Sequence, residues 1–329
     1  MVIRPLGLCL LLMAVLPPAA FCQIFQLAEL NANQIRALDR AKTVVLIPGG
    51  ILEEHGPYLP SFTDGYVDAA ATQALARSIV ARPGWIVVIF PAVPLGSGGA
   101  NGIGGKWSFP GSYTVRSGTL RAVYMDLSTE LGEQGFRWIF LVNDHGDPLH
   151  ARALNEASRY FNDVYGGTMV HLRDLMPIAT CCGTEEKLFT PSELAEEGFT
   201  VHAGADEHSQ ILFLHPELVD PAYQNAPSLT GKDVADLFRI AGAKDWPGYF
   251  GAPRLARASL GAQQFSEFVR VESELVLKIL DGMDYRAIPR FSDQFDLSKI
   301  PGLQAEFEHD RAWEDKEKEW LKSVGNQKR

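Results

Sequence analysis

Carboxylate and imidazole side chains gather within residues 44–64, VVLIPGGILEEHGPYLPSFTD. The apolar opening of this segment is typical of a buried strand, and the Pro-Gly-Gly turn ends that strand. Glu53 and His55 follow, and Asp64 opens the next predicted helix. Ligands bind beyond the carboxyl ends of strands in open α/β sheets, and these donor groups suit zinc, manganese or iron. The segment therefore predicts a metal site; the alternative is a solvated loop in which Asp64 caps the helix.

A second cluster follows another apolar run. Residues 138–142 have the pattern of a buried strand, and the Asp-His-Gly-Asp run beyond them supplies His145 and Asp147. Because parallel strands bring their carboxyl ends to the same edge of a sheet, we expect these side chains to meet the first cluster. The coincidence strengthens the prediction of a metal site.

A third cluster, HAGADEHS at residues 202–209, lies at a predicted turn into a helix. His202 and Glu207 are its candidate site residues, whereas His208 is expected to point elsewhere. A surface position or a satisfied core position is expected for the histidines outside these clusters: His150, His171, His215 and His309.

Strands and helices that could position these clusters alternate along the chain. Apolar runs predict strands at residues 42–47, 85–90, 138–142 and 168–172. Helical periodicity predicts helices at residues 27–40, 66–82, 117–134, 148–160 and 261–280, and another helix begins at Gly204. This alternation predicts a mainly parallel sheet with helices on both faces, which is a three-layer α/β/α sandwich.

Two other segments are distinctive. The glycine-rich residues 96–105 lack the spacing of a phosphate loop, and we expect a mobile lid or substrate loop, with a plain linker as the alternative. Residues 303–322 are charge-dense, with Trp313 and Trp320 seven apart on one helical face. This tail is expected to be a solvated helix anchored by the two aromatics, although it could pack on its own domain or on a neighbouring subunit.

Composition limits the class of protein. The chain has 329 residues, of which 46% are hydrophobic and 21% charged, as in ordinary globular proteins. The net charge of -10 argues against a broad nucleic-acid surface. We expect residues 23–290 to form the main domain and residues 291–329 a charged helical tail, with no membrane span.

The N-terminal residues have a different character. Residues 1–22 combine Arg4, a short apolar run and a small-residue end, which predicts a secretory signal peptide and a secreted or periplasmic protein. The alternative is a buried N-terminal helix. Cys181 and Cys182 are adjacent, which is too close for an unstrained disulfide, so they are expected to be ordinary loop thiols or a reactive pair.

Several blocks also resemble a known family. Residues 53–64 are similar to the pattern E-x-H-G-P-H-L-P…T-D, residues 143–146 to N-G-H-G, and residues 202–209 to H-A-G-x-x-E-T-S. Residues 109–112, FPGS, are similar to F-P-G-T. The creatininase (creatinine amidohydrolase) family carries these blocks in this order, and the resemblance spans about residues 28–282. It implies a creatininase-like fold.

The resemblance also implies two divalent metal ions, which would be zinc, manganese or iron. Glu53 and His145 would bind one ion, His55 would bind the other, and Asp64 would bridge them. Asp147 stands where creatininase has a glutamate ligand but is one methylene shorter than that residue.

Roles for the third cluster follow from the same resemblance. Glu207 is the alternative fifth ligand or a base, and His202 matches a histidine that carries protons to the leaving nitrogen. The implied protein is a binuclear amidohydrolase that hydrolyses a non-peptide C–N bond in a small cyclic amide or formamide-like substrate, and a homo-oligomer, by resemblance a hexamer. Tyr58, His208 and the lack of Trp between residues 138 and 246 depart from the family pattern and argue against creatinine as the substrate.

Two other functions remain open. Binuclear metal sites also serve phosphoesterases, although no basic phosphate clamp lies near the clusters. A non-catalytic secreted binding protein on the same scaffold is the second alternative, against which the intact metal-ligating residues argue.

Overall fold

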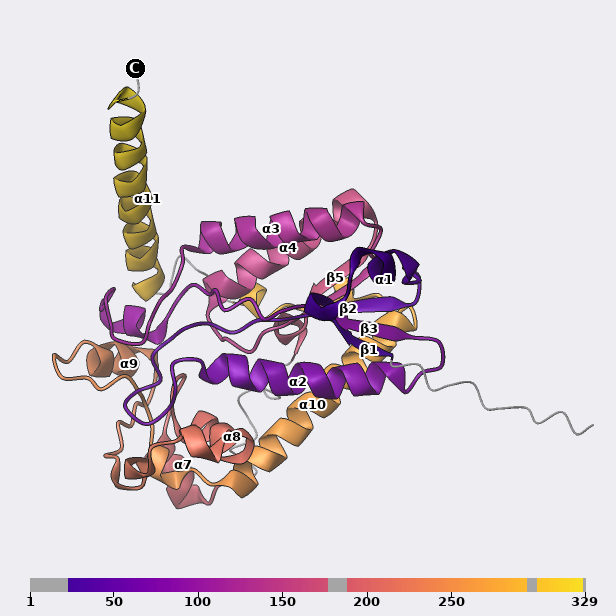
Figure 1. Ribbon diagram of the computed structural model, residues 1–329. Coiled ribbons are helices and arrows are strands. Elements are labelled where there is room, and N and C mark those ends of the chain that lie inside the picture. Colours follow the sequence, from indigo (N-terminus) through magenta and orange to yellow (C-terminus); the bar gives the residue numbers. More distant parts are fainter. Residues whose placement is uncertain (1–22, 177–187, 295–300, 328–329) are drawn as a thin grey trace, which may run out of the picture.

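The computed structural model describes residues 23–176, 188–294 and 301–327. Its centre is a five-stranded sheet in the order β1-β3-β2-β4-β5, in which every pairing is parallel (Figure 1). The strands are β1 (Ile24–Gln26), β2 (Thr43–Pro48), β3 (Ile86–Ile89), β4 (Trp138–Val142) and β5 (Thr168–His171). The signal peptide predicted for residues 1–22 and the thiols of Cys181 and Cys182 lie outside the described residues.

Helices cover both faces of this sheet, so the predicted three-layer α/β/α architecture is confirmed (Figure 1). Helices α2 (Thr63–Val80) and α10 (Ala258–Leu280) pack on one face, and α3 (Ser117–Glu133) and α4 (Pro148–Tyr165) pack on the other. The remaining α-helices described are α1 (Ala32–Ala37), α7 (Pro191–Glu197), α8 (Ala205–Leu214), α9 (Val234–Ala241) and α11 (Pro301–Gln327).

The central strand β2 explains why the sheet is buried on both sides. Its side chains alternate between the faces: Val44 and Leu46 join the core beneath α2 and α10, whereas Val45 and Ile47 join the core beneath α3 and α4. All four residues are fully buried. A strand that is apolar at every position is therefore required here.

The connections on either side of β2 diverge beyond its carboxyl end. The chain leaves β2 through α2 to β3 on one side, and it later reaches β4 on the other side. Connections that diverge in this way leave room for a ligand between the loops that follow the two strands. The loops that carry the first two clusters follow β2 and β4, which are parallel, so both clusters lie at this edge of the sheet.

The predicted elements are largely present, and the main differences lie near the N-terminus. The short strand β1 was not expected, because three half-buried residues carry little periodicity. The helix expected at residues 27–40 is shorter. Leu27–Glu29 forms a 3-10 turn, and Asn31 starts α1 with a capping box that Gln34 completes.

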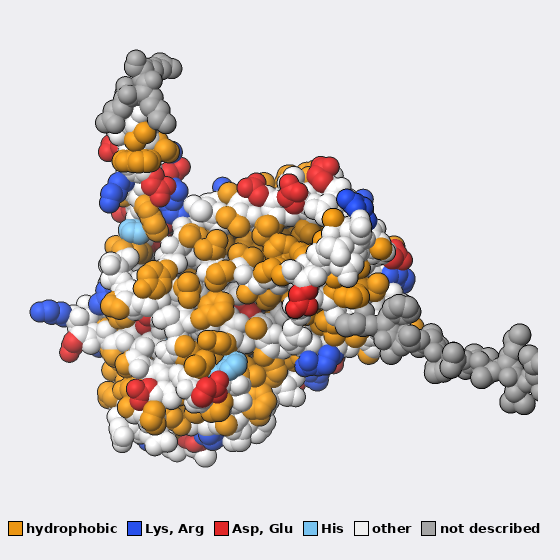
Figure 2. Space-filling model, viewed as in Figure 1, with side chains coloured by type: hydrophobic (Ala, Val, Ile, Leu, Met, Phe, Trp, Pro, Cys, Tyr) orange, Lys and Arg blue, Asp and Glu red, His pale blue; other side chains and the backbone are white. Residues whose placement is uncertain are grey.

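Helix α11 stands away from the body at one end of the molecule (Figures 1 and 2). Its contacts with the main domain include a hydrogen bond from the Ser117 amide to Asp310 and an ion pair between Arg116 and Glu317. The expected anchoring role does not extend to Trp320, which is 63% exposed. Within the described residues, no helix combines the length and the apolar composition that crossing a bilayer requires.

Candidate metal centre

The first cluster lies in the loop between β2 and α2. The backbone amide of Glu53 donates to the carbonyl of Ser61 at 2.9 Å, which folds this loop back on itself. Asp64 lies in the first turn of α2, whose N-cap is Phe62, so Asp64 does not cap the helix. Glu53, His55 and Asp64 are all buried. The loop therefore directs two carboxylates and an imidazole into the interior.

Asp64 stands between two histidines from different loops. Its Oδ1 is 3.1 Å from Nε2 of His55, and its Oδ2 is 3.2 Å from Nδ1 of His145. Each carboxylate oxygen thus faces one imidazole. This is the arrangement expected of a carboxylate that bridges two metal ions.

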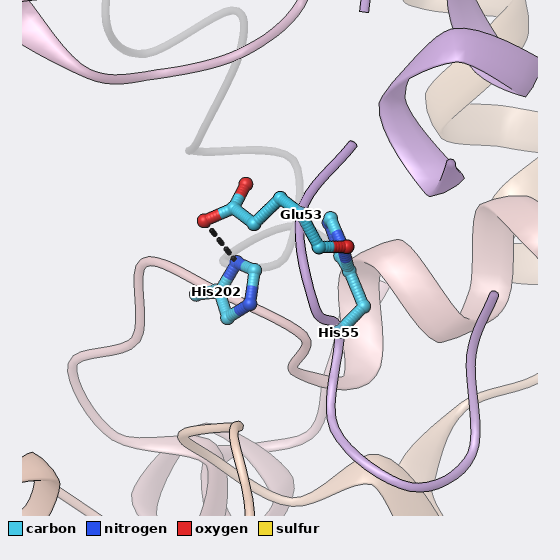
Figure 3. A group of neighbouring side chains, drawn as sticks. All are labelled: Glu53, His55 and His202. Atoms are coloured by element: carbon cyan, nitrogen blue, oxygen red, sulfur yellow. Dashed lines mark hydrogen bonds and ion pairs between the residues drawn. The ribbon is translucent and has the colours of Figure 1, made fainter. Parts of the chain in front are cut away.

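Three overlapping groups of ligand atoms are close enough to hold a metal ion. The groups are Glu53, Asp64 and His145; His55, Asp64 and Glu207; and Glu53, His55 and His202. Figure 3 shows the last group converging, with the ion pair between Glu53 and His202 drawn as a dashed line. The structure therefore brings together six of the seven residues selected from the sequence.

The seventh residue, Asp147, lies outside these groups. Its carboxylate accepts a hydrogen bond from the His150 amide at 2.7 Å and caps the N-terminus of α4. In this geometry Glu207, with its Oε1 3.7 Å from Nε2 of His55, completes the five-residue set instead. The shorter side chain of Asp147 is occupied by the start of its own helix.

A hydrogen bond to a backbone carbonyl orients each of the three imidazoles. Nδ1 of His55 bonds to the carbonyl of Glu53, Nε2 of His145 to that of Ser97, and Nε2 of His202 to that of Glu54. The ring nitrogen that faces a carbonyl carries a proton. The other nitrogen of each ring is directed into the site. Metal-ligating histidines are commonly held in this way.

Two buried carboxylate oxygens that share one ring nitrogen support the same assignment. Oε2 of Glu53 and Oδ2 of Asp64 lie 3.3 Å and 3.2 Å from Nδ1 of His145, and neither accepts a well-aligned hydrogen bond within the described part of the chain. Burying a carboxylate oxygen without a partner is costly. A divalent cation would satisfy both oxygens, so these residues fit a metal.

The protonation of the site shows how strongly its charges interact. Burial lowers the pKa of His145, but the carboxylates of Glu53 and Asp64 outweigh burial and raise it to about 10. Burial likewise lowers the pKa of His55, and Glu207 and Asp64 raise it well above its usual value. The carboxylates therefore favour the positively charged form of both rings.

His202 lies at the rim of the first cluster. Its Nδ1 is 3.7 Å from Oε1 of Glu53, and its ring centre is 4.3 Å from that of His55. Burial lowers its pKa, whereas the charge of Glu53 raises it, to about 9. The next residue, Ala203, has a φ of 50°, which is rare for a residue other than glycine, and its amide donates to Glu207. This strained turn places both His202 and Glu207 toward the first cluster.

The glycine-rich segment forms one wall of the site, so a plain linker is the wrong interpretation of it. The amide of Ala100, the first residue of the 3-10 helix η2 (Ala100–Gly104), donates to Oε1 of Glu53 at 2.5 Å. The carbonyl of Ser97 orients His145. A Cβ on Gly98 would lie only 2.0 Å from Cγ of Asp147, so only glycine allows this close approach.

Sequence reasoning did not select two residues that support the site. Glu54 is buried, accepts from the Gly56 amide at 2.9 Å and lies 3.6 Å from Nε2 of His202. Asp68 accepts from the amide of Asp144 at 2.9 Å and so holds the turn that presents the second cluster. The available signals were the position of Glu54 between Glu53 and His55 and that of Asp68 one helical turn after Asp64.

The other histidines have the structural roles expected of them. His150 and His171 are fully buried, and each forms a hydrogen bond through one ring nitrogen. His208 is buried and bonds through Nδ1 to the carbonyl of Gly204. His215 is partly exposed beside Glu217. None of these four belongs to a metal-binding group among the described residues.

Comparisons with known sequences agree with this site. The profile of the creatininase family, described as creatinine amidohydrolase, matches residues 28–276. The chain is 28% identical over 258 residues to the mycofactocin precursor peptide peptidase of Mycobacterium ulcerans, covering 74% of this chain and 88% of that protein. It is 27% identical over 191 residues to the creatinine amidohydrolase of Pseudomonas putida, covering 54% of this chain and 66% of that protein.

Comparisons with solved structures show the same fold. A structure named Creatininase Mn superposes with a TM-score of 0.58 at 20% identity, covering 78% of this chain and 98% of that chain. A mutant creatininase of Zn-Zn type gives a TM-score of 0.53 at 21% identity, covering 77% of this chain and 97% of that chain.

Proposed function

Because the chain belongs to the creatininase family of metal-dependent amidohydrolases, we propose that it hydrolyses the C–N bond of a small amide at a pair of divalent metal ions. Zinc and manganese are the favoured ions, since solved creatininases are named with each; iron suits the same donors. The proposed ligands are Glu53 and His145 for one ion and His55 and Glu207 for the other, with Asp64 between them.

The position of Asp64, whose two carboxylate oxygens face different histidines, is the observation that supports this proposal. One oxygen faces His55 and the other faces His145, each at hydrogen-bond distance. A structural carboxylate would need only one such partner. Two histidines on opposite oxygens favour two metal positions that share one carboxylate.

The chain's own residues would then orient the substrate and move a proton. When bound, the two ions would acidify a water molecule and polarise the amide carbonyl. His202, held through Nε2 by the carbonyl of Glu54, presents Nδ1 to the site and is proposed to protonate the departing nitrogen, which is a poor leaving group until it is protonated. Glu207 is the alternative proton carrier.

The type of C–N bond defines two candidate substrates. A cyclic amide or formamide-like compound with a non-peptide bond is the first candidate. A small peptide is the second, and the similarity to a peptidase over 74% of the chain favours it. The metal chemistry is the same for both, because each has an amide carbonyl and a nitrogen leaving group.

The test is a substrate panel with metal-loaded protein. We expect at least one cyclic amide, formamide or dipeptide to be hydrolysed, detected as newly formed amine, and no p-nitrophenol to be released from p-nitrophenyl phosphate. Asp64→Asn should lose both metal and activity, whereas Asp126→Asn, which alters an exposed carboxylate on α3, should keep both. Phosphate release without amide hydrolysis, or full activity in Asp64→Asn, would overturn the proposal. Little tightly bound metal in the native protein would instead favour the non-catalytic binding protein.

A further inference from the structure

Glu54 lies between two of the proposed metal ligands, Glu53 and His55, but it belongs to none of the metal-binding groups found in the described part of the chain. Its side chain is nevertheless buried. Burying a carboxylate is costly unless neighbouring groups bind it. The contacts of Glu54 therefore indicate what a second glutamate does at this position.

Nε2 of His202 faces two oxygens of this one residue. It lies 2.6 Å from the backbone carbonyl oxygen of Glu54 and 3.6 Å from Oε1 of the side chain. Oε1 is buried and has no hydrogen-bond partner among the described residues. A buried acid beside the far nitrogen of a proton-transferring imidazole is the arrangement found in hydrolytic triads, where the acid holds the ring in its working orientation.

The other carboxylate oxygen of Glu54 is fixed by the backbone. Oε2 accepts from the Gly56 amide at 2.9 Å. A Cβ on Gly248 would lie 2.0 Å from the same oxygen, and Gly248 has a φ of 100°. Glycine at position 248 thus allows both the backbone conformation and the close approach of the carboxylate. Because Oε2 is held in this way, Oε1 stays directed toward His202.

The backbone of Glu54 is also held in place. Its amide donates to Oγ of Ser112 at 3.1 Å, and that hydroxyl donates to Oδ1 of Asn101 at 2.8 Å. Ser112 is the last residue of the FPGS block, and Asn101 lies in η2 of the glycine-rich segment. These two hydrogen bonds connect the peptide that carries the carbonyl acceptor for His202 to both segments.

We propose that Glu54 is a positioning residue, whose carboxylate and carbonyl together hold the ring of His202 so that Nδ1 faces the amide at the metal centre. The link to the amide rests on the proposed function. Glu54→Gln is the informative variant, because the Gly56 amide needs an acceptor and would retain the carbonyl oxygen of the new side chain. The NH2 group would then face the ring N–H of His202, and two opposed donors would turn the ring away.

Proton NMR of the zinc-loaded full chain tests the contact without a substrate. A buried, hydrogen-bonded ring N–H gives a slowly exchanging downfield resonance, and its loss in His202→Ala would assign it. We expect this resonance to move or disappear in Glu54→Gln. It should persist in Glu217→Gln, which alters the partner of the partly exposed His215. An unchanged resonance in a folded Glu54→Gln variant, or no such resonance in the parent, would overturn the contact.

Kinetics on a substrate from the panel test its consequence. Glu54→Gln should keep its metal content and KM and lose about 10–100-fold in kcat, because a small misplacement of a reacting group costs about that much. Combining Glu54→Gln with His202→Ala should be no slower than His202→Ala alone, since Glu54 acts through His202.

Loss of metal in Glu54→Gln, or a further loss of rate in the double variant, would overturn the positioning role. An unchanged kcat in a variant that has lost the resonance would refute its catalytic consequence. A resonance that depends on Glu54, found in a protein without amidase activity, would support the contact and count against the proposed function alone.

Discussion

The role of each histidine at the metal centre is assigned from the direction in which its ring nitrogens point. His55, His145 and His202 each bond to a backbone carbonyl through one nitrogen and direct the other inward. They differ in their neighbours, because His55 and His145 face Asp64, whereas Nδ1 of His202 lies 3.7 Å from Oε1 of Glu53. This difference favours metal binding by the first two and proton transfer by His202.

We therefore expect His202→Ala to keep its metal content and to lose about 10²–10⁴-fold in kcat, the usual contribution of an acid–base group. Substrate affinity should change little. Elemental analysis and steady-state kinetics would measure the two effects, with the partly exposed His215→Ala as the control. Loss of a metal ion in His202→Ala would make His202 a ligand and Glu207 the better proton carrier. If neither metal nor rate changed, the third cluster would be structural.

A second residue determines how stability should depend on pH. Glu272 on α10 is buried, and neither of its carboxylate oxygens has a hydrogen-bond partner among the described residues. Burial, followed by the charge of Asp144, raises its pKa to about 8 from 4.5. A folded-state pKa above the unfolded value means that its contribution to stability is present below pH 4.5 and is lost as pH rises through 8.

Glu272→Gln should remove this dependence. Because each pKa unit corresponds to about 1.4 kcal/mol and the pKa rises from 4.5 to about 8, the variant should gain up to about 5 kcal/mol in unfolding free energy over the parent between pH 4.5 and 8. Urea unfolding of the metal-loaded protein at several pH values would measure the gain. The control is Glu274→Gln, an exposed carboxylate on the same helix, for which no such trend is expected. Parallel pH profiles for Glu272→Gln and the parent would contradict the assignment.

Among the structural elements, the glycine-rich segment does more than connect β3 to α3. It donates an amide to Glu53, orients His145 through Ser97, and lies beside α11. Its glycines are required by close approach as well as by backbone conformation. Gly98 has a φ of 76° and faces Asp147, whereas Gly105 has a φ of 69° and faces open space.

Substitutions of Gly98 and Gly105 distinguish the effect of close approach from the effect of backbone conformation. Both Gly98→Ala and Gly105→Ala should incur the cost of a left-handed conformation, about 1–2 kcal/mol. Only Gly98→Ala should displace Asp147 and the adjoining wall, so we expect metal affinity to fall about tenfold or more in that variant alone. Competition with a metallochromic chelator would report the affinities. Equal affinities in the two variants would show that the wall does not position the metal centre.

For the chain as a whole, we propose export and assembly. Residues 1–22 have the pattern of a signal peptide, and we expect mature protein from the native host to lack them. Mass spectrometry of the purified, active protein would test this, and an intact Met1 would contradict it.

Assembly is proposed from the resemblance to the creatininase family. Trp320 and Leu321 of α11 are 63% and 61% exposed, and hydrophobic side chains are visible on the part of this helix that projects from the body (Figure 2). We expect light scattering to report an oligomer at micromolar concentration, with a hexamer as the proposed state. A strict monomer would exclude this assembly.

The sequence by itself determined the sheet and the chemical character of the site. Apolar runs defined β2 and β4 to within about one residue, because a strand buried on both faces has no polar positions. Clusters immediately after those strands had to share an edge, since all the strands are parallel. Glu53, His55 and His145 could therefore be selected without coordinates.

Only the tertiary structure decided how these groups face one another. The two-sided position of Asp64 and the entry of Glu207 depend on packing between segments far apart in the chain, which local patterns do not encode. The same holds for the contact of α11 with the glycine-rich segment. Its polar sequence indicated a solvated helix, because hydrophobic periodicity cannot register a contact made largely by carboxylates, an imidazole and glycine backbone.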